Sequence, residues 1–178
     1  QGNPPPQPMS NICLGVTLYL SKNNFNNLSI NNNFLIPESF IGNSNETQKE
    51  FNHFKSIIKP ITTGKVYTES ECELYQTSYF KFENDDISLT PVYLQKYIEK
   101  KYEVRITIIN SIFYTVRIDT MNKLDWRKDY DNHKYMLIEC PEKIKQQCLA
   151  MLKYFNLDFG AFDYIVTPDN DWVFLEVN

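Results

Sequence analysis

Long apolar segments are absent from this chain of 178 residues: no run approaches the roughly 18 uncharged apolar residues that a transmembrane helix needs. The longest candidate, residues 12–20, is too short to span a bilayer. A secretory signal peptide is not expected either, because it carries basic residues before its apolar part and residues 1–10 contain none. We therefore expect a soluble, cytoplasmic protein that does not act on a membrane.

Metal-binding and basic residues are also scarce. The four cysteines show no CxxC spacing and no nearby pair of histidines, so neither a structural zinc site nor a disulfide scaffold is expected. Lys and Arg number 18 against 22 Asp and Glu, which gives a net charge of -4. A general nucleic-acid-binding protein has the opposite balance, so we do not expect nucleic acid as a partner.

The composition does provide for a core, since 42% of the residues are hydrophobic and 15% are aromatic. The length suits one domain or two small lobes. Residues 1–10 contain four prolines and are predicted to be a linker. Because the chain begins with Gln1 rather than Met and stops at Asn178 directly after an apolar run, we expect a fragment.

Short β-branched runs dominate the rest of the chain. Residues 103–110 and 112–119 are predicted to form a tight antiparallel hairpin with Ser111 between them. Helical spacing of apolar residues predicts one helix over 141–155 and a shorter one over 45–54. Further strands are predicted over residues 34–41 (broken by a proline), 56–60, 74–82, 93–98, 162–167 and 172–177. This order indicates an α+β fold with antiparallel sheets, not a doubly wound parallel sheet.

Acidic residues interrupt the last two predicted strands. If a short hairpin pairs these strands, Asp163 and Glu176 lie side by side, and Asn178 shares the face of Glu176 because side chains alternate along a strand. Three oxygen ligands from adjacent strands suit Mg²⁺. The alternative is an exposed hairpin face, which we consider weaker because two like charges opposite each other repel unless a cation lies between them.

Basic residues at other strand ends suggest anion binding. Lys59 ends a short apolar strand just before Pro60, where a lysine can hold a phosphate, although a solvated lysine is the commoner explanation. Glu103 and Arg105 lie two residues apart and therefore share one strand face. They can bind a ribose hydroxyl and a phosphate, or they can form a cross-strand ion pair on a solvated sheet.

Residues 93–98 form an apolar strand whose end can take an adenine through its backbone, or can simply belong to the core. We interpret Lys96, Lys100 and Lys101 as a solvated rim.

Taken in order, these motifs resemble the ATP-grasp superfamily. They are Lys-Pro at 59–60, Leu-Gln-Lys-Tyr-Ile at 94–98, Glu-x-Arg at 103–105, Asp-Trp-Arg at 125–127, Phe-Gly-Ala-Phe-Asp at 159–163 and Phe-Leu-Glu-Val-Asn at 174–178. More narrowly, the chain is similar to the graspetide peptide ligases, the microviridin-type and "grasp-with-spasm" macrocyclases. The resemblance covers residues 34–178, and the single glycine after the Lys-Pro strand, Gly64, favours this glycine-poor branch.

The resemblance implies two α+β lobes that hold ATP between antiparallel sheets. Residues 1–33 would be a linker and a remnant of the preceding region, 34–98 the central lobe, and 99–178 the carboxy-terminal lobe, truncated after Asn178. The family's amino-terminal domain would be largely missing, and the family suggests a homodimer.

The resemblance also implies which residues hold the nucleotide. Lys59 would contact the ATP phosphates, and Glu103 would hold the ribose. The hinge against adenine would consist of Gln95, Lys96, Tyr97 and Ile98.

For the reacting groups, the resemblance implies that Arg105 and Arg127 face the γ-phosphate and an acyl-phosphate intermediate. Asp163, Glu176 and Asn178 would coordinate Mg²⁺. The enzyme would phosphorylate an Asp or Glu side chain of a ribosomally made precursor peptide, and a Ser, Thr or Lys side chain of that peptide would then form an ester or amide crosslink. Two alternatives share these motifs: an ATP-grasp ligase that adds an amino acid to a protein or small acceptor, and a non-catalytic relative that binds nucleotide or peptide.

Overall fold

The structure is a computed structural model, and the part of the chain that it describes is residues 34–43, 49, 51, 53, 55–59, 61, 65–67, 72–74, 77–81, 91–122, 124 and 133–178. For 65–67 and 72–74 the description covers the backbone alone. Strands β1 to β6 are Ser39–Gly42, Ser56–Lys59, Lys65–Tyr67, Cys72–Leu74, Ser78–Tyr79 and Val92–Lys96. They are followed by β7 (Tyr102–Ile109), β8 (Ile112–Asp119), β9 (Lys134–Leu137), α4 (Glu142–Phe155), β10 (Phe159–Val166) and β11 (Trp172–Val177).

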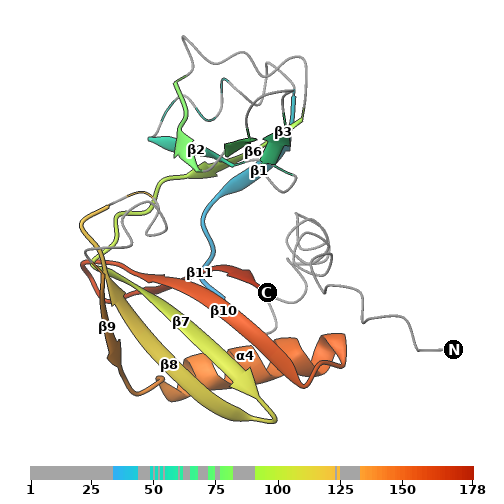
Figure 1. Cartoon of the computed structure of the whole chain (residues 1–178), viewed down its shortest axis with the longest axis vertical. Coiled ribbons are helices and arrows are strands. Elements are labelled where there is room, and N and C mark those ends of the chain that lie inside the picture. The colour runs from blue at the N-terminus through green and yellow to red at the C-terminus, as the bar shows by residue number, and fades with distance from the viewer. Residues whose placement is uncertain are drawn as a thin grey trace, which may run out of the picture.

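The first half of the chain forms a small antiparallel sheet in the order β1-β6-β2-β5, and β3 and β4 form a separate hairpin. Leu94 of β6 is fully buried on one face of the small sheet and packs with Phe51. Figure 1 shows the small sheet above a larger one, with the C-terminal end of the chain on the side of the larger sheet that faces the small one.

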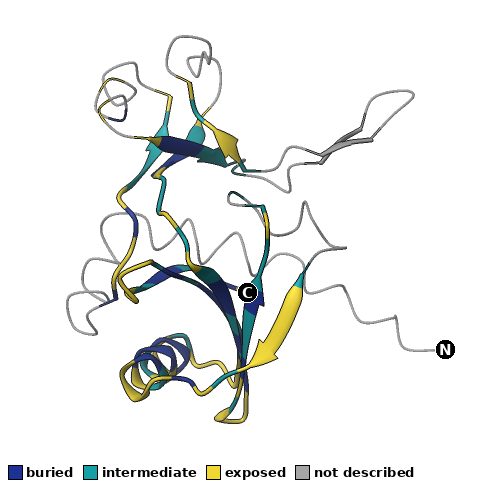
Figure 2. Ribbon diagram, turned by 90° about the vertical axis from the view of Figure 1, so that its left-hand side faces the viewer, coloured by how far each residue is buried: buried dark blue, intermediate teal, exposed yellow. Residues whose placement is uncertain are grey.

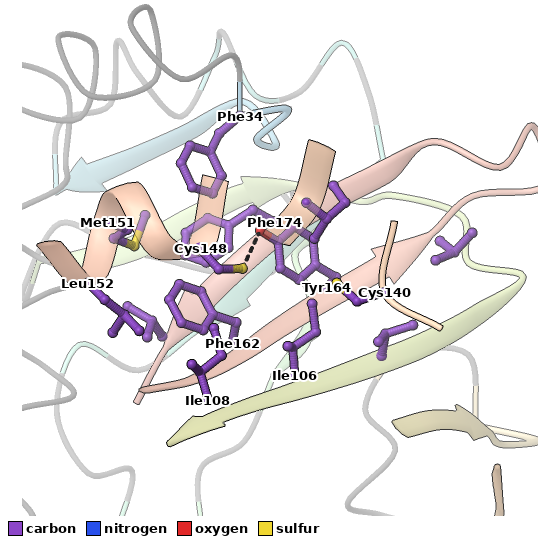
Figure 3. Close-up of a cluster of buried hydrophobic side chains, with 14 residues drawn as sticks. Phe34, Ile106, Ile108, Cys140, Cys148, Met151, Leu152, Phe162, Tyr164 and Phe174 are labelled. Carbon is purple, nitrogen blue, oxygen red and sulfur yellow. Dashed lines mark hydrogen bonds between the residues drawn. The ribbon is translucent and has the colours of Figure 1, made fainter. Parts of the chain in front are cut away.

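The second half forms a five-stranded antiparallel sheet in the order β11-β10-β7-β8-β9. Helix α4 covers one face of this large sheet (Figure 2). Apolar residues alternate along each strand, so one face of β7 carries Val104, Ile106 and Ile108 into the core. Figure 3 shows Ile106 and Ile108 facing Cys148 and neighbouring side chains of α4. Burial of this face against the helix leaves the other face of the large sheet for function.

Helix α4 begins and ends where local chemistry favours it. Pro141 precedes its first turn, where a missing N–H costs nothing, and Glu142 places negative charge at the positive end of the helix dipole. Asn156 adopts the left-handed conformation at the end, and its N–H contacts the carbonyl groups of Leu152 and Lys153. The helix predicted over residues 141–155 is confirmed.

The hairpin predicted over residues 103–119 is confirmed, with one difference. Its turn contains two residues, Asn110 and Ser111, and both have positive φ, at 48° and 65°. Two-residue hairpin turns favour two left-handed residues because this conformation matches the twist of the strands, and Asn tolerates it better than most side chains.

The remaining secondary-structure predictions are not all confirmed. The single strand predicted over residues 74–82 is wrong, because β4 ends at Leu74 and a separate strand, β5, spans Ser78–Tyr79. Strand β9 was not expected; it is short, and all four of its residues are exposed. In the helix predicted over 45–54, residues 49 and 51 are helical and most of the range lies outside the described residues. None of the helices in the described part of the chain has the length and apolarity to cross a membrane.

Candidate functional site

A row of three charged residues crosses the open face of the large sheet. Strand register places Asp163 of β10 opposite Arg105 of β7 on one side and Glu176 of β11 on the other. Arg105 and Asp163 lie on the opposite face from α4, because the neighbouring positions in both strands fill the core. The expectation that Asp163 and Glu176 lie side by side is confirmed.

Asp163 is held by two neighbours. Arg105 donates from Nε to Oδ1 at 2.8 Å and from Nη2 to Oδ2 at 2.7 Å, a bidentate ion pair. Asn178 donates from Nδ2 to the same Oδ2 at 3.4 Å. Asp163 therefore already has a cationic partner within the protein, the guanidinium of Arg105.

A β-bulge decides which way Glu176 points. Tyr164 pairs with Phe174, and the next residue, Asp163, pairs with Glu176, so Leu175 is an extra residue in β11. Without it, Phe174 and Glu176 would share a face, since they are two residues apart. With it, Phe174 and Val177 both enter the core, and Glu176 is free to share the face of Asp163.

The donor set fits a divalent cation of the Mg²⁺ type. Two carboxylates and one amide oxygen supply hard oxygen ligands from two paired strands. In the described part of the chain, no three His, Cys, Asp or Glu residues cluster as metal ligands, so an ion here would rely on Asn178 or on ligands from outside the protein. Asp163 would also have to share its oxygens between Arg105 and the ion.

Glu103 lies on the same face of β7 as Arg105 but has a different partner. It forms an ion pair with Lys100 in which the side chains of Lys100 and Glu103 are 5% and 11% exposed. The interpretation of Lys100 as part of a solvated rim is therefore wrong: burying Glu103 requires a nearby positive charge.

Lys59, the predicted phosphate contact, is the last residue of β2 and therefore belongs to the small sheet. Register places it opposite Tyr93 of β6, and its Nζ lies 5.6 Å from the centre of the Tyr93 ring. Burial raises the pKa of Tyr93, a hydrogen bond to Ser39 opposes this, and the negative charge of Glu176 raises it further. Tyr93 is thus within electrostatic reach of Glu176 in the other sheet.

Several polar groups of the predicted adenine hinge already form hydrogen bonds within the protein. The N–H groups of Lys96 and Tyr97 donate to the carbonyl groups of Glu38 and Lys55, both at 2.8 Å, so adenine cannot use them without breaking these bonds. The side-chain amide of Gln95 is buried and bonded to Ser39.

Tyr97 has its own aromatic environment beyond the end of β6. Its ring centre lies 5.6 Å from that of Tyr79, and the Nζ of Lys55 lies 4.1 Å from the Tyr97 ring. The pKa of Tyr97 is raised to about 12, first by burial and then by Tyr79.

Sequence reasoning missed Ser39 and Lys100 as members of this region, and it placed Tyr93 only in the strand predicted to take an adenine. Lys100 had a usable signal, its spacing of three residues from Glu103. The predicted phosphate contact Arg127 lies outside the described residues.

Comparisons with known proteins are consistent with this geometry. No protein-family model matches the chain, and no curated protein matches it significantly in sequence. Several solved structures do match the chain. A RiPP-associated ATP-grasp ligase of Chryseobacterium gregarium, in complex with ADP and with a leader and core peptide, has a TM-score of 0.80 and 29% identity, over 89% of this chain and 51% of that one.

Two further structures extend the comparison. The macrocyclase MdnC of Microcystis aeruginosa MRC, bound with its precursor peptide MdnA, has a TM-score of 0.73 and 25% identity, over 97% of this chain and 54% of that one. The N5-carboxyaminoimidazole ribonucleotide synthetase purK is more distant, with a TM-score of 0.57 and 14% identity, over 91% of this chain and 45% of that one. The chain has the ATP-grasp fold, resembles the RiPP ATP-grasp ligases and macrocyclases, and spans about half the length of these proteins.

Proposed function

We propose that the protein is an ATP- and Mg²⁺-dependent peptide ligase that acts on a ribosomally made precursor peptide. The observation that carries this proposal is the charged row of Glu176, Asp163 and Arg105 on the open face of the large sheet, within an ATP-grasp fold. Lys59 supports the proposal from the small sheet, because its Nζ lies 5.6 Å from the ring of Tyr93, a residue that the negative charge of Glu176 reaches.

The proposed reaction has two steps. An oxygen of an Asp or Glu side chain of the peptide attacks the γ-phosphorus of ATP, and the bond to the bridging oxygen breaks to release ADP. A Ser or Thr hydroxyl, or a Lys amine, of the same peptide then attacks the acyl carbon. Inorganic phosphate and a proton leave, and an ester or amide crosslink forms.

The residues of this chain would bind and orient the reactants. Lys59 would hold the ATP phosphates, and Glu103 the ribose. Arg105, together with Arg127, would place positive charge beside the phosphoryl group as negative charge moves onto its oxygens. Asp163, Glu176 and Asn178 would hold Mg²⁺, which when bound neutralises phosphate charge.

A peptide substrate is supported by the character of the similar proteins. The ligase of Chryseobacterium gregarium and the macrocyclase MdnC, at 29% and 25% identity, are described in complex with leader, core or precursor peptides. The similarity to purK, at 14% sequence identity, supports only the assignment of the fold. We therefore favour a precursor peptide over a small-molecule acceptor.

The test is a calorimetric titration of the full-length protein with a non-hydrolysable ATP analogue, with and without Mg²⁺, followed by turnover with a precursor peptide. We expect Mg²⁺-dependent binding, and mass spectrometry should show the loss of one water per crosslink. Glu176→Gln should abolish turnover without unfolding the protein, because it removes a charge at a half-buried position and keeps the shape of the side chain.

Glu142→Gln is the matched control, since Glu142 lies on α4 on the other side of the large sheet and is exposed. It should behave like the wild type. Wild-type product formation by Glu176→Gln would refute the metal assignment, and a lack of nucleotide binding by the wild-type protein would refute the ligase proposal.

A further inference from the structure

Three polar side chains form a closed hydrogen-bond network on the small sheet. The amide of Gln95 donates from Nε2 to Tyr93 Oη at 2.9 Å and to Ser39 Oγ at 3.1 Å. Tyr93 donates to Ser39 Oγ at 3.1 Å, and Ser39 donates to the carbonyl oxygen of Pro37 at 2.9 Å. Each hydroxyl proton therefore has an acceptor, and the network ends on the backbone of the segment that precedes β1.

That segment connects the two sheets. Leu35 forms a parallel bridge with Val173 of β11, and the N–H of Phe174 donates to the carbonyl of Leu35 at 2.8 Å. The ring of Phe34 packs on that of Phe174, with centres 5.3 Å apart, in the core of the large sheet (Figure 3). The network thus holds the small sheet to a segment that is itself held to β11, two residues before Glu176.

The same network borders both halves of the candidate site. Tyr93 lies opposite Lys59 in the neighbouring strand, with the Lys59 Nζ near its ring. The negative charge of Glu176 acts on Tyr93 from the large sheet. Tyr93 is accordingly the residue of β6 that lies beside Lys59 and within the range of the charge of Glu176.

We propose that Ser39, Tyr93 and Gln95 are positioning residues that set the separation between Lys59 on the small sheet and Glu176 on the large sheet. The inference rests on the proposed function, because a nucleotide between the sheets must reach both groups at once. Small displacements of groups that must act together are costly, since a shift of about 1 Å can reduce a rate about a hundredfold.

A purely structural role makes a different prediction. A buried amide such as Gln95 needs a partner, and Ser39 alone supplies one. Removal of the Tyr93 hydroxyl leaves the bond between Gln95 and Ser39 in place and keeps the ring beside Lys59. If the network served only to satisfy Gln95, Tyr93→Phe would therefore have little effect on nucleotide binding.

The experiment measures the affinity of the full-length protein for a non-hydrolysable ATP analogue with and without Mg²⁺. Tyr93→Phe and Ser39→Ala should each weaken binding in Mg²⁺ about tenfold, the effect of losing one hydrogen bond of average strength. Without Mg²⁺ the affinity should change by less than about threefold. The nucleotide then has no metal ion to connect it to Glu176, so the separation between the two sheets matters less. Both substitutions remove the bond between the Tyr93 and Ser39 hydroxyls, so the loss in the double variant should be smaller than the sum of the two single losses.

Tyr154→Phe is the matched control, because Tyr154 lies exposed on α4, on the other side of the large sheet. It should bind like the wild type. Wild-type affinity of both Tyr93→Phe and Ser39→Ala would overturn the positioning role, and so would an equal loss with and without Mg²⁺ or a loss accompanied by a lower unfolding midpoint. If any of these results is found while the wild type still binds the analogue in a Mg²⁺-dependent way, only the positioning role is refuted. If the wild type shows no Mg²⁺-dependent binding, the proposed function is refuted as well.

Discussion

Replacement of Arg105 by Met tests whether its guanidinium stabilises the buried carboxylate of Asp163, which lies beside Glu176. Met has a similar length but no charge, so Arg105→Met removes the bidentate ion pair and leaves Asp163 facing Glu176 across the strands. We expect this substitution to destabilise the fold even though Arg105 lies on the open face of the large sheet and is itself partly exposed.

The magnitude follows from how far each partner is exposed. Removal of one partner from a fully buried ion pair costs about 3–5 kcal/mol, because the other charge is left without compensation. The side chain of Asp163 is only 11% exposed, but that of Arg105 is 35% exposed, so water already screens part of the pair. We therefore expect Arg105→Met to cost about 2–3 kcal/mol. Asp163→Asn should cost less, about 1 kcal/mol, because the guanidinium that remains can be hydrated.

The assay is chemical denaturation at neutral pH, with Arg117→Met as the matched control. Arg117 also makes bidentate bonds, to Asp119 two residues along the same strand, but both side chains are about a third exposed, at 30% and 36%. The loss of this pair and of its stacking on Tyr102 should cost about 1 kcal/mol or less. Mg²⁺ should restore part of the stability of Arg105→Met, because a ligand that binds only the folded state stabilises it.

Equal costs for Arg105→Met and Arg117→Met would refute this reasoning. So would a larger cost for Asp163→Asn than for Arg105→Met, because the unpaired guanidinium, and not the buried carboxylate of Asp163, would then be the group that is destabilised most.

Two further predictions concern the core beneath the site. Phe162→Ala should reduce the free energy of unfolding by about 3–5 kcal/mol, because its ring is fully buried between β10 and α4, whereas Phe159→Ala, at a position 49% exposed, should cost no more than about 1 kcal/mol; similar losses in denaturation would contradict the assigned core. Burial raises the pKa of Cys148 to about 12, so its thiol should resist alkylation at pH 9 in the folded protein and react in urea, as peptide mapping would show. Because the folded pKa lies above the ordinary value of 9.0, the protonated thiol favours the folded state, and stability should fall as pH rises from 9 toward 12, by at most about 1.4 kcal/mol per pH unit for this group. Folded protein that alkylates Cys148 as fast as unfolded protein would contradict the burial.

Local chemistry was sufficient to predict much of the large sheet. The β-branched runs of the hairpin and the helical spacing in α4 each determine their own conformation within a short window, and both predictions are confirmed. The prediction for residues 74–82 was wrong, since their alternation indicated one strand where the structure has the last residue of β4 and the separate strand β5. Alternation reports which side chains can share a face; it does not report where the chain turns.

The candidate site could also be predicted only in part from the sequence. The sequence predicted that Asp163 and Glu176 would pair, because a short turn between two strands restricts their register. It did not predict Arg105 as the cationic partner of Asp163, because that contact joins residues 58 positions apart. The network of Ser39, Tyr93 and Gln95 escaped prediction for the same reason, since Ser39 and Gln95 are separated by 56 positions.

The sequence by itself determined which residues alternate, where acids interrupt apolar strands and where α4 begins and ends, because these features depend on neighbours in the chain. Only the tertiary structure decided the direction of Glu176, through the extra residue Leu175, and the burial of Lys100 beside Glu103. Both depend on which strands and side chains meet in space. A bulge is specified by the fit of Phe174 and Val177 into a core that residues from distant elements complete, and a buried ion pair by the surroundings that exclude water from it.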